Sequence, residues 1–152
     1  MRFKKLIGLL IAIMTACGIF AHPKAAVLAA APRPAQNKAA QVEFITAEQL
    51  KAKIAAKEPV MIVDLRGQSA YDASDQTVKG SLHTKVRKVA YRLRELPRDR
   101  EIVTYCSCPA DEAAIIGAQN LLAKGFTRVR VLKGGWNAWL QAGGQVEPKP
   151  RL

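Results

Sequence analysis

Two cysteines, Cys106 and Cys108, stand between a segment typical of a strand and a segment typical of a helix. Residues 102–105 are β-branched or aromatic, and residues 110–124 carry an apolar stripe at helical spacing. A thiol at a helix N-terminus faces unpaired N–H groups and tends toward the thiolate, the nucleophilic form. The same groups can stabilise an anion carried on the sulfur. A cysteine that only fills space at a strand end is an equally open alternative.

Two charged residues, Asp64 and Arg66, follow a second apolar segment. Residues 60–63 form a continuous apolar run, which is typical of a strand buried on both faces of a parallel sheet. Ligands of such sheets bind at the carboxyl ends of the strands, where we also expect Cys106. Because buried charges need partners, we expect Asp64 and Arg66 to support the site rather than to react.

Strand and helix patterns alternate through most of the chain. Thr46 and Gln49 have the spacing of a capping box, which predicts a helix that ends before Pro59. Pro109 suits the first position of the helix over 110–124. The alternation predicts an α/β fold with an open parallel β-sheet and helices on both faces. The expected strands are 42–45, 60–63, 102–105 and 129–132, and the further helical segments are 69–73, 86–96 and 136–142.

The N-terminal part differs from this pattern. Basic residues precede an apolar run over 6–20, which predicts a signal peptide or membrane anchor over 1–21. Residues 22–41 form an Ala/Pro-rich linker, and the domain occupies 42–148. Cys17 stands in a segment that resembles a lipobox, so it is a possible lipidation site. We expect an exported protein, either periplasmic or tethered to the outer side of the cytoplasmic membrane.

Composition limits the classes of protein to consider. The 152 residues suit one domain, and 49% hydrophobic residues argue against a disordered chain. Three cysteines are too few for a disulfide scaffold, and His22 and His83 do not pair with a cysteine motif at zinc spacing.

Much of the net charge of +12 lies in one segment, Lys79–Arg100. This segment is either a solvated surface or a site for an acidic protein partner. We do not expect nucleic-acid binding, because no aromatic interleaving or known motif accompanies the charge.

Several short motifs together resemble the rhodanese-like (sulfurtransferase) domain family. Their order and spacing match the family over residues 43–147. The motifs are Val63-Asp64-Leu65-Arg66, Val78-Lys79-Gly80-Ser81-Leu82-His83, Ile102 to Cys106, Gly125-Phe126, Val129 to Leu132, and Lys133-Gly134-Gly135-Trp136-Asn137-Ala138-Trp139.

The resemblance implies that Cys106 accepts a sulfane sulfur as a persulfide and passes it to a thiol or to cyanide. A small sulfur donor and a thiophilic acceptor are then the substrates, and no metal or organic cofactor is implied. The resemblance also implies that the backbone of one loop holds the persulfide. That loop comprises Ser107, Cys108, Pro109, Ala110, Asp111 and Glu112.

The loop departs from the commonest family pattern, in which an arginine lies at the sixth position. Asp111 takes that position and Glu112 follows, so repulsion disfavours thiosulfate, a dianion, as the donor. Cys108 could also form a strained disulfide with Cys106. Three interpretations therefore stay open: a sulfurtransferase, a non-catalytic rhodanese-like binding module, and a thiol–disulfide redox protein that uses both cysteines.

Overall fold

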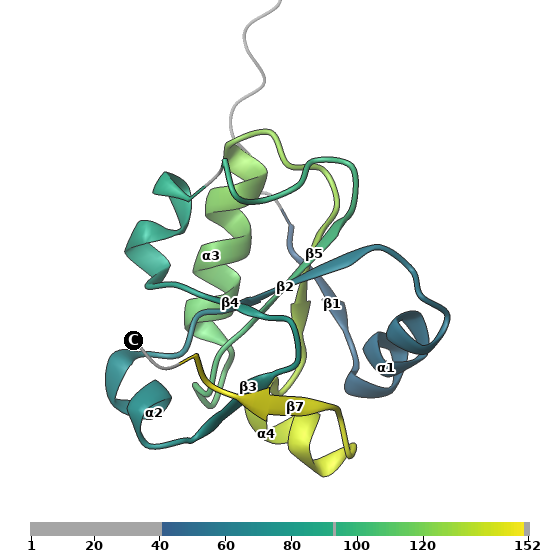
Figure 1. The fold of residues 1–152 in the computed structure, drawn as a ribbon. Helices are drawn as coiled ribbons and strands as arrows, with labels where there is room; N and C mark the ends of the chain where they lie inside the picture. The colour runs from purple at the N-terminus through teal and green to yellow at the C-terminus, as the bar shows by residue number, and fades with distance from the viewer. Residues whose placement is uncertain (1–40, 93, 151–152) are drawn as a thin grey trace, which may run out of the picture. The chain divides into compact units, whose positions relative to one another are not determined.

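The fold is built on a five-stranded sheet in which every neighbouring pair is parallel (Figure 1). The strand order is β1-β6-β5-β2-β4. The prediction of an open parallel sheet is confirmed. The strands are β1 (Glu43–Ile45), β2 (Val60–Asp64), β4 (Leu82–His83), β5 (Glu101–Tyr105) and β6 (Val129–Leu132).

The computed structural model describes residues 41–92 and 94–150. The predicted leader, nearly all of the predicted linker, and Cys17 lie outside the described residues. Within the described part of the chain, no helix is long and apolar enough to cross a membrane.

The central strands β2 and β5 place the candidate site residues. Their register pairs Val60 with Glu101 and Asp64 with Tyr105, so the two strands end level with each other. Arg66 and Cys106 follow these ends directly. The expectation that Asp64, Arg66 and Cys106 share one edge of the sheet is therefore confirmed.

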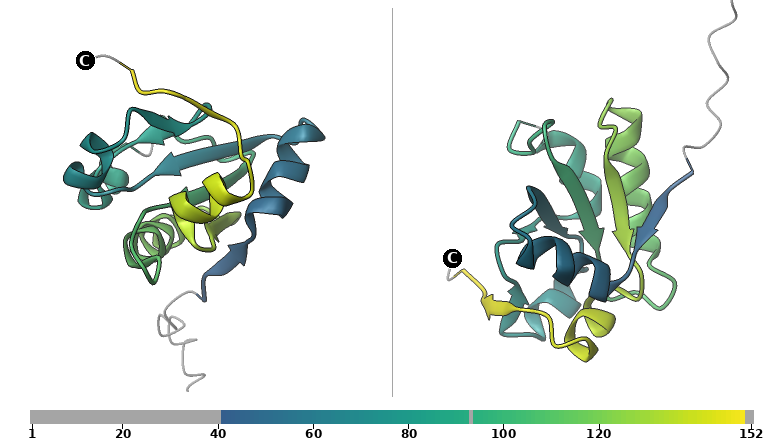
Figure 2. Two further views of the ribbon diagram at one scale, coloured as in Figure 1. Left: turned by 90° about the horizontal axis from the view of Figure 1, so that it is seen from below. Right: turned by 90° about the vertical axis from the view of Figure 1, so that its right-hand side faces the viewer.

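Helices cover both faces of the sheet, as predicted (Figures 1 and 2). On one face, α1 (Ala47–Ala55) and α4 (Gly135–Gln141) pack through Leu50 and Trp139 against a cluster that includes Ile62 and Val103. On the other face, α3 (Glu112–Ala123) and the 3₁₀ helix η1 (Val86–Tyr91) pack against Val63 and Ile102. Alternate residues of each central strand thus serve opposite cores.

The start of α1 has the capping box that the sequence predicts. The Thr46 hydroxyl accepts the Gln49 N–H at 3.2 Å, and the Gln49 side chain accepts the Thr46 N–H at 3.0 Å. This exchange satisfies two N–H groups that a helix start would otherwise leave unpaired.

Two features differ from the predictions. A second, antiparallel sheet joins β3 (Gln76–Val78) to β7 (Val146–Pro148) beside α2 (Gln68–Asp72), and no local pattern indicates a pairing so distant in sequence. The predicted helix over 86–96 is wrong, because only η1 forms there. Neighbouring like charges such as Lys88 and Arg92 disfavour an α-helix, and no side chain caps its start.

Candidate functional site

The loop between β5 and α3 carries Cys106 at its start and Asp111 at its end. α3 begins at Glu112, so the prediction that it starts at Pro109 or Ala110 is wrong. Asp111 adopts the left-handed conformation with φ of 56°, which interrupts the helix before it can extend to the proline. Pro109 and Ala110 are exposed, whereas Ser107 and Cys108 are half-buried.

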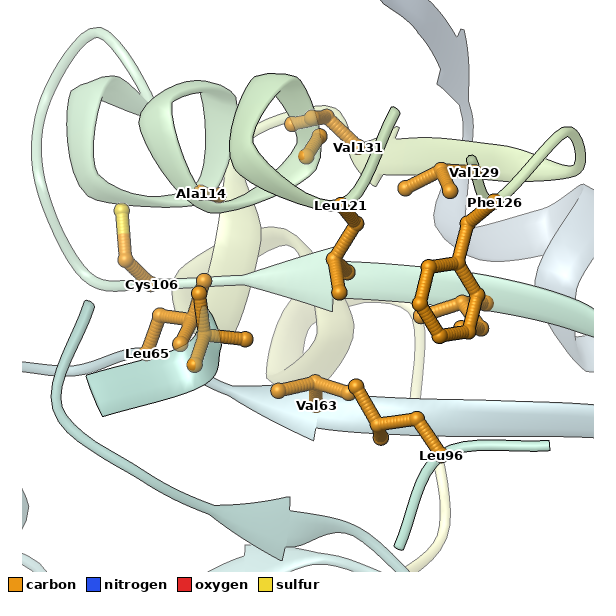
Figure 3. Close-up of a cluster of buried hydrophobic side chains, with 12 residues drawn as sticks. Val63, Leu65, Leu96, Cys106, Ala114, Leu121, Phe126, Val129 and Val131 are labelled. Atoms are coloured by element: carbon orange, nitrogen blue, oxygen red, sulfur yellow. The ribbon is translucent and has the colours of Figure 1, made fainter. Parts of the chain in front are cut away.

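Cys106 is fully buried, at 0% exposure. Its side chain lies beneath the first turns of α3, among residues that include Leu65 and Ala114 (Figure 3). The Cys106 Sγ accepts a hydrogen bond from the Cys108 N–H at 3.3 Å. The sulfur therefore does face a backbone donor at the entry to a helix, as expected.

Burial raises the pKa of the Cys106 thiol to about 11, and contact with the Cys108 side chain adds to the rise. The backbone N–H groups of Cys108 and Ala114 lower the pKa, but by less. The expectation that Cys106 tends toward the thiolate is therefore wrong for the resting thiol. Removal from water outweighs the favourable backbone groups, an effect that the position in the sequence does not reveal.

The turn between β6 and α4 holds this loop in place. The Trp136 N–H donates to the Cys106 carbonyl oxygen at 2.8 Å, and the Gly134 N–H donates to Asp111 Oδ2 at 2.9 Å. Gly135 lies between them with φ of 50°, and a Cβ there would overlap the Cys106 carbonyl oxygen. The glycine pair thus lets one backbone approach another closely.

The two acidic residues of the loop have different surroundings. Asp111 is buried and its carboxylate is engaged by the Gly134 N–H, whereas Glu112 is exposed in the first turn of α3. Asp111 therefore positions the loop against the β6–α4 turn. The sequence assigns Asp111 to the persulfide-holding loop and gives its side chain only a charge effect on the substrate, because the Gly134 contact joins residues far apart in the chain.

Asp64 and Arg66 form a buried ion pair at the end of β2. The Arg66 Nη2 lies 2.7 Å from Asp64 Oδ2, and both side chains are fully buried. Tyr105 Oη donates to the same oxygen at 2.7 Å, and Thr77 Oγ1 donates to it at 3.1 Å. Arg66 also donates to the Gln76 carbonyl oxygen at 3.0 Å, which ties β3 to the site.

Several of these partners shift the pKa of Asp64. Burial by itself raises it, but the His83 ring, the Arg66 guanidinium and N–H, and the Tyr105 hydroxyl outweigh burial. The pKa of Asp64 consequently lies well below its usual range, so the carboxylate stays charged.

His83 and Tyr105 are site residues that sequence reasoning treated as ordinary loop and packing positions. The His83 ring stacks on Tyr71 with centroids 3.6 Å apart, and its Nδ1 lies 3.8 Å from Asp64 Oδ1. The signal for His83 is its register, because β4 pairs it directly with Asp64. That pairing can be found only once β4 is placed beside β2.

The ion pair acts on the loop through the backbone and through Trp136. The Leu65 N–H donates to the Tyr105 carbonyl oxygen at 2.8 Å, and Leu65 packs in the cluster that contains Cys106. The Arg66 guanidinium lies over the Trp136 ring, 4.3 Å from its centroid. Since Trp136 also binds the Cys106 carbonyl oxygen, the network supports the loop from behind, as expected.

No group of three or more His, Cys, Asp or Glu side chains within residues 41–92 and 94–150 is arranged to hold a metal ion. The site contains one buried thiol, one half-buried thiol, and a loop that is hydrogen-bonded to the β6–α4 turn. This arrangement can bind and transfer a group on sulfur.

Comparison with known proteins identifies the family. The model of the rhodanese-like domain family matches residues 46–142. The chain belongs to this family. This rhodanese-like chain is 29% identical to a protein named sulfurtransferase from Allochromatium vinosum, over 67% of its own length and 92% of the relative. It is 24% identical to the thiosulfate sulfurtransferase GlpE of Coxiella burnetii, over 57% of its length and 78% of the relative.

Solved structures agree with this assignment. The crystal structure of the Alr3790 protein from Anabaena sp. superposes with a TM-score of 0.60 at 30% identity, covering 69% of this chain and 82% of that one. The rhodanese-like fold and the family resemblance predicted from the motifs are therefore confirmed.

Proposed function

We propose that this protein is a sulfurtransferase that carries a sulfane sulfur as a persulfide on Cys106 and passes it to a thiol or to cyanide. The observation that carries the proposal is the position of Cys106 Sγ, which accepts the Cys108 N–H at the entry to α3. An anionic sulfur there is next to backbone donors. The sulfurtransferase names of two relatives support the same reaction class.

The reaction takes place in two displacements. The Cys106 thiolate attacks the outer sulfur of the donor, the donor's sulfur–sulfur bond breaks, and the remainder leaves with the electron pair. The acceptor then attacks the outer sulfur of the Cys106 persulfide and regenerates the thiolate. No net oxidation occurs, so the chain needs no redox cofactor for this cycle.

A polysulfide or a thiol persulfide suits the loop better than thiosulfate does. Residues 106–112 include Asp111 and Glu112 but no lysine or arginine. An incoming dianion therefore finds no cationic side chain in the loop to offset its charge.

Sulfur transfer to cyanide tests this proposal. We expect thiocyanate formation with polysulfide, a lower rate with thiosulfate, and a large loss of activity in Cys106→Ser with either donor. Ser69→Ala is the control, because Ser69 is exposed on α2 outside the Cys106 loop and its change leaves both thiols. Full activity in Cys106→Ser would contradict the proposal.

We also propose that an acidic protein partner docks on the basic cluster, defined as Lys85, Arg87 and Lys88. All three side chains are exposed, and among the described residues none of them forms a salt bridge. They follow the end of β4, whose register with Asp64 places that end on the Cys106 edge of the sheet. Complementary charge there would steer an acidic partner toward the loop.

Three other basic residues of the Lys79–Arg100 segment have contacts of their own. Arg92 pairs with Glu95 and Arg100 with Asp99. Arg98 donates to the carbonyl oxygens of Lys124 and Gly125. The proposed docking surface is accordingly smaller than the segment that the sequence indicates.

We propose that residues 1–21 direct the protein out of the cytoplasm. The support is the basic start and apolar run of this segment. Fractionation of bacteria that express the full chain is expected to place the domain in the periplasm or on the outer side of the cytoplasmic membrane. Recovery in the cytoplasm with residues 1–21 intact would contradict this.

A further inference from the structure

The two thiols of the loop differ in their access to solvent. Cys106 is 0% exposed, whereas Cys108 is half-buried on the edge of the same apolar cluster. The Cys106 sulfur lies beneath the start of α3, enclosed by side chains that include Leu65 and Ala114 (Figure 3). A sulfur donor in solution therefore meets the Cys108 thiol before it can meet that of Cys106.

The two cysteines are also in direct contact. The Cys108 N–H donates to Cys106 Sγ at 3.3 Å, and the neighbouring Cys108 side chain helps to raise the pKa of the Cys106 thiol. A group held on the Cys108 sulfur is thus close to the buried thiol without a large movement of the chain.

Hydrogen bonds hold the loop in place on both sides of Cys108. Before it, the Cys106 carbonyl oxygen accepts the Trp136 N–H at 2.8 Å. After it, the Asp111 carboxylate accepts the Gly134 N–H at 2.9 Å, and the Asp111 N–H donates to the Cys108 carbonyl oxygen at 3.2 Å. These contacts keep the half-buried thiol beside the buried one.

We propose that Cys108 is a second catalytic residue, the thiol on which the sulfane sulfur enters before it passes to Cys106. This inference rests on the proposed function, because it concerns how the Cys106 persulfide is formed. It differs from the redox interpretation, in which the two cysteines are oxidised to a disulfide.

The relay consists of two balanced thiol–persulfide exchanges. The Cys108 sulfur attacks the outer sulfur of a donor R–S–SH, the donor's S–S bond breaks, and R–SH leaves with the Cys108 proton. The Cys106 sulfur then attacks the outer sulfur of the Cys108 persulfide. The Cys108 sulfur leaves with the electron pair of that S–S bond and takes the Cys106 proton. The sum is R–S–SH plus Cys106–SH giving R–SH plus Cys106–S–SH, with no oxidant or reductant.

This route also supplies a base for the buried thiol. Burial disfavours the Cys106 thiolate, which slows a direct attack on a donor in solution. In the relay, the sulfur that receives the proton belongs to Cys108, whose backbone N–H already binds the Cys106 sulfur. The proton therefore moves between neighbouring sulfurs and does not have to reach water.

Time-resolved peptide mass spectrometry tests the relay. The full chain is reduced, freed of reductant, pulsed with inorganic polysulfide and quenched with an alkylating agent that marks persulfides. We expect the wild type to carry the added sulfur on Cys106, and Cys106→Ser to carry it on Cys108. In Cys108→Ser, Cys106 should load about tenfold more slowly or worse, yet reach the wild-type level after long exposure.

Ser69→Ala, at an exposed position on α2 outside the Cys106 loop, is the control and should load at the wild-type rate. Two results would overturn the relay and leave the proposed function intact. One is Cys106→Ser without sulfur on Cys108, and the other is Cys108→Ser that loads Cys106 as fast as the wild type does. Failure of Cys106 to load in any variant, even after long exposure, would overturn the proposed function as well. Loss of two hydrogens by the wild type without a gain of sulfur would favour the redox interpretation over both.

Discussion

The reactivity of Cys106 depends on two opposing influences. Backbone N–H groups at the entry to α3 favour an anionic sulfur, whereas complete burial disfavours it and raises its pKa. The resting thiol is therefore protected from reagents in solution. The buried Asp64–Arg66 pair contributes at a distance, since it contacts Trp136 and not the sulfur.

The pH dependence of alkylation tests the protection of Cys106. With a pKa of about 11, the thiolate fraction rises with pH, so its alkylation rate should increase about tenfold per pH unit between about pH 7 and 10. Fragment masses of the labelled peptide separate Cys106 from Cys108. The urea-unfolded chain is the control, and its rate should level off above about pH 8.5. A folded-state rate that levels off at or below that pH would show that the pKa is not raised.

At the scale of elements, the site depends on three segments that meet at one sheet edge. Asp64 ends β2, Cys106 follows β5 directly, and the β6–α4 turn binds both ends of the loop from Cys106 to Asp111. Gly135 is essential to that last contact, because only a residue without a Cβ lets its backbone approach that of Cys106.

Gly135→Ala should therefore impair both stability and sulfur transfer. Strain at positive φ and overlap with the Cys106 carbonyl oxygen should lower the free energy of unfolding by about 2–4 kcal/mol. Gly67→Ala is the matched control, since an added Cβ there meets open space and φ is −59°. It should leave stability unchanged or raise it by up to about 1 kcal/mol in urea unfolding. Equal effects of the two substitutions would contradict the role of Gly135.

Local patterns predicted the elements that carry the chemistry. The apolar runs before Asp64 and Cys106 correspond to β2 and β5, and the Thr46–Gln49 box starts α1. The β3–β7 pair, the Asp111–Gly134 bond and the His83–Asp64 neighbourhood join segments far apart in the chain, so no local pattern reveals them. The raised pKa of Cys106 likewise depends on packing, and sequence position alone indicated the opposite direction.

At the scale of the whole molecule, the basic side chains fall into two groups, those that bind other parts of the chain and those that face solvent. Some basic side chains of the Lys79–Arg100 segment bind neighbouring carboxylates or carbonyl groups, and the basic cluster on η1 does not. The proposed partner surface thus lies beside the catalytic edge. Exported proteins that carry sulfur to other proteins would need such a surface, whereas transfer to a small acceptor would not.

Charge reversal of the basic cluster tests whether it binds acidic partners. Lys85→Glu, Arg87→Glu and Lys88→Glu together should abolish salt-sensitive binding to an immobilised polyglutamate peptide, because all three side chains are exposed cations. Sulfur transfer from polysulfide to cyanide should stay within about twofold of the wild type, because rim charges mainly affect association.

The control is a second triple reversal with the same change of net charge, Lys57→Glu, Lys124→Glu and Lys133→Glu, at exposed lysines outside the cluster. It should retain most of the binding. Equal loss of binding in the two triple variants would show that net charge, and not a defined surface, attracts the acidic probe.

The central claim is that Cys106 is the sulfur carrier. Intact-mass measurement of the full chain after exposure to polysulfide, before and after addition of cyanide, tests it most directly. We expect a gain of one sulfur atom that is located on Cys106 at equilibrium, is removed by cyanide, and also occurs in Ser69→Ala. A chain that gains no sulfur on Cys106 with any donor would contradict the account, and would leave a non-catalytic rhodanese-like binding module as the function of the domain.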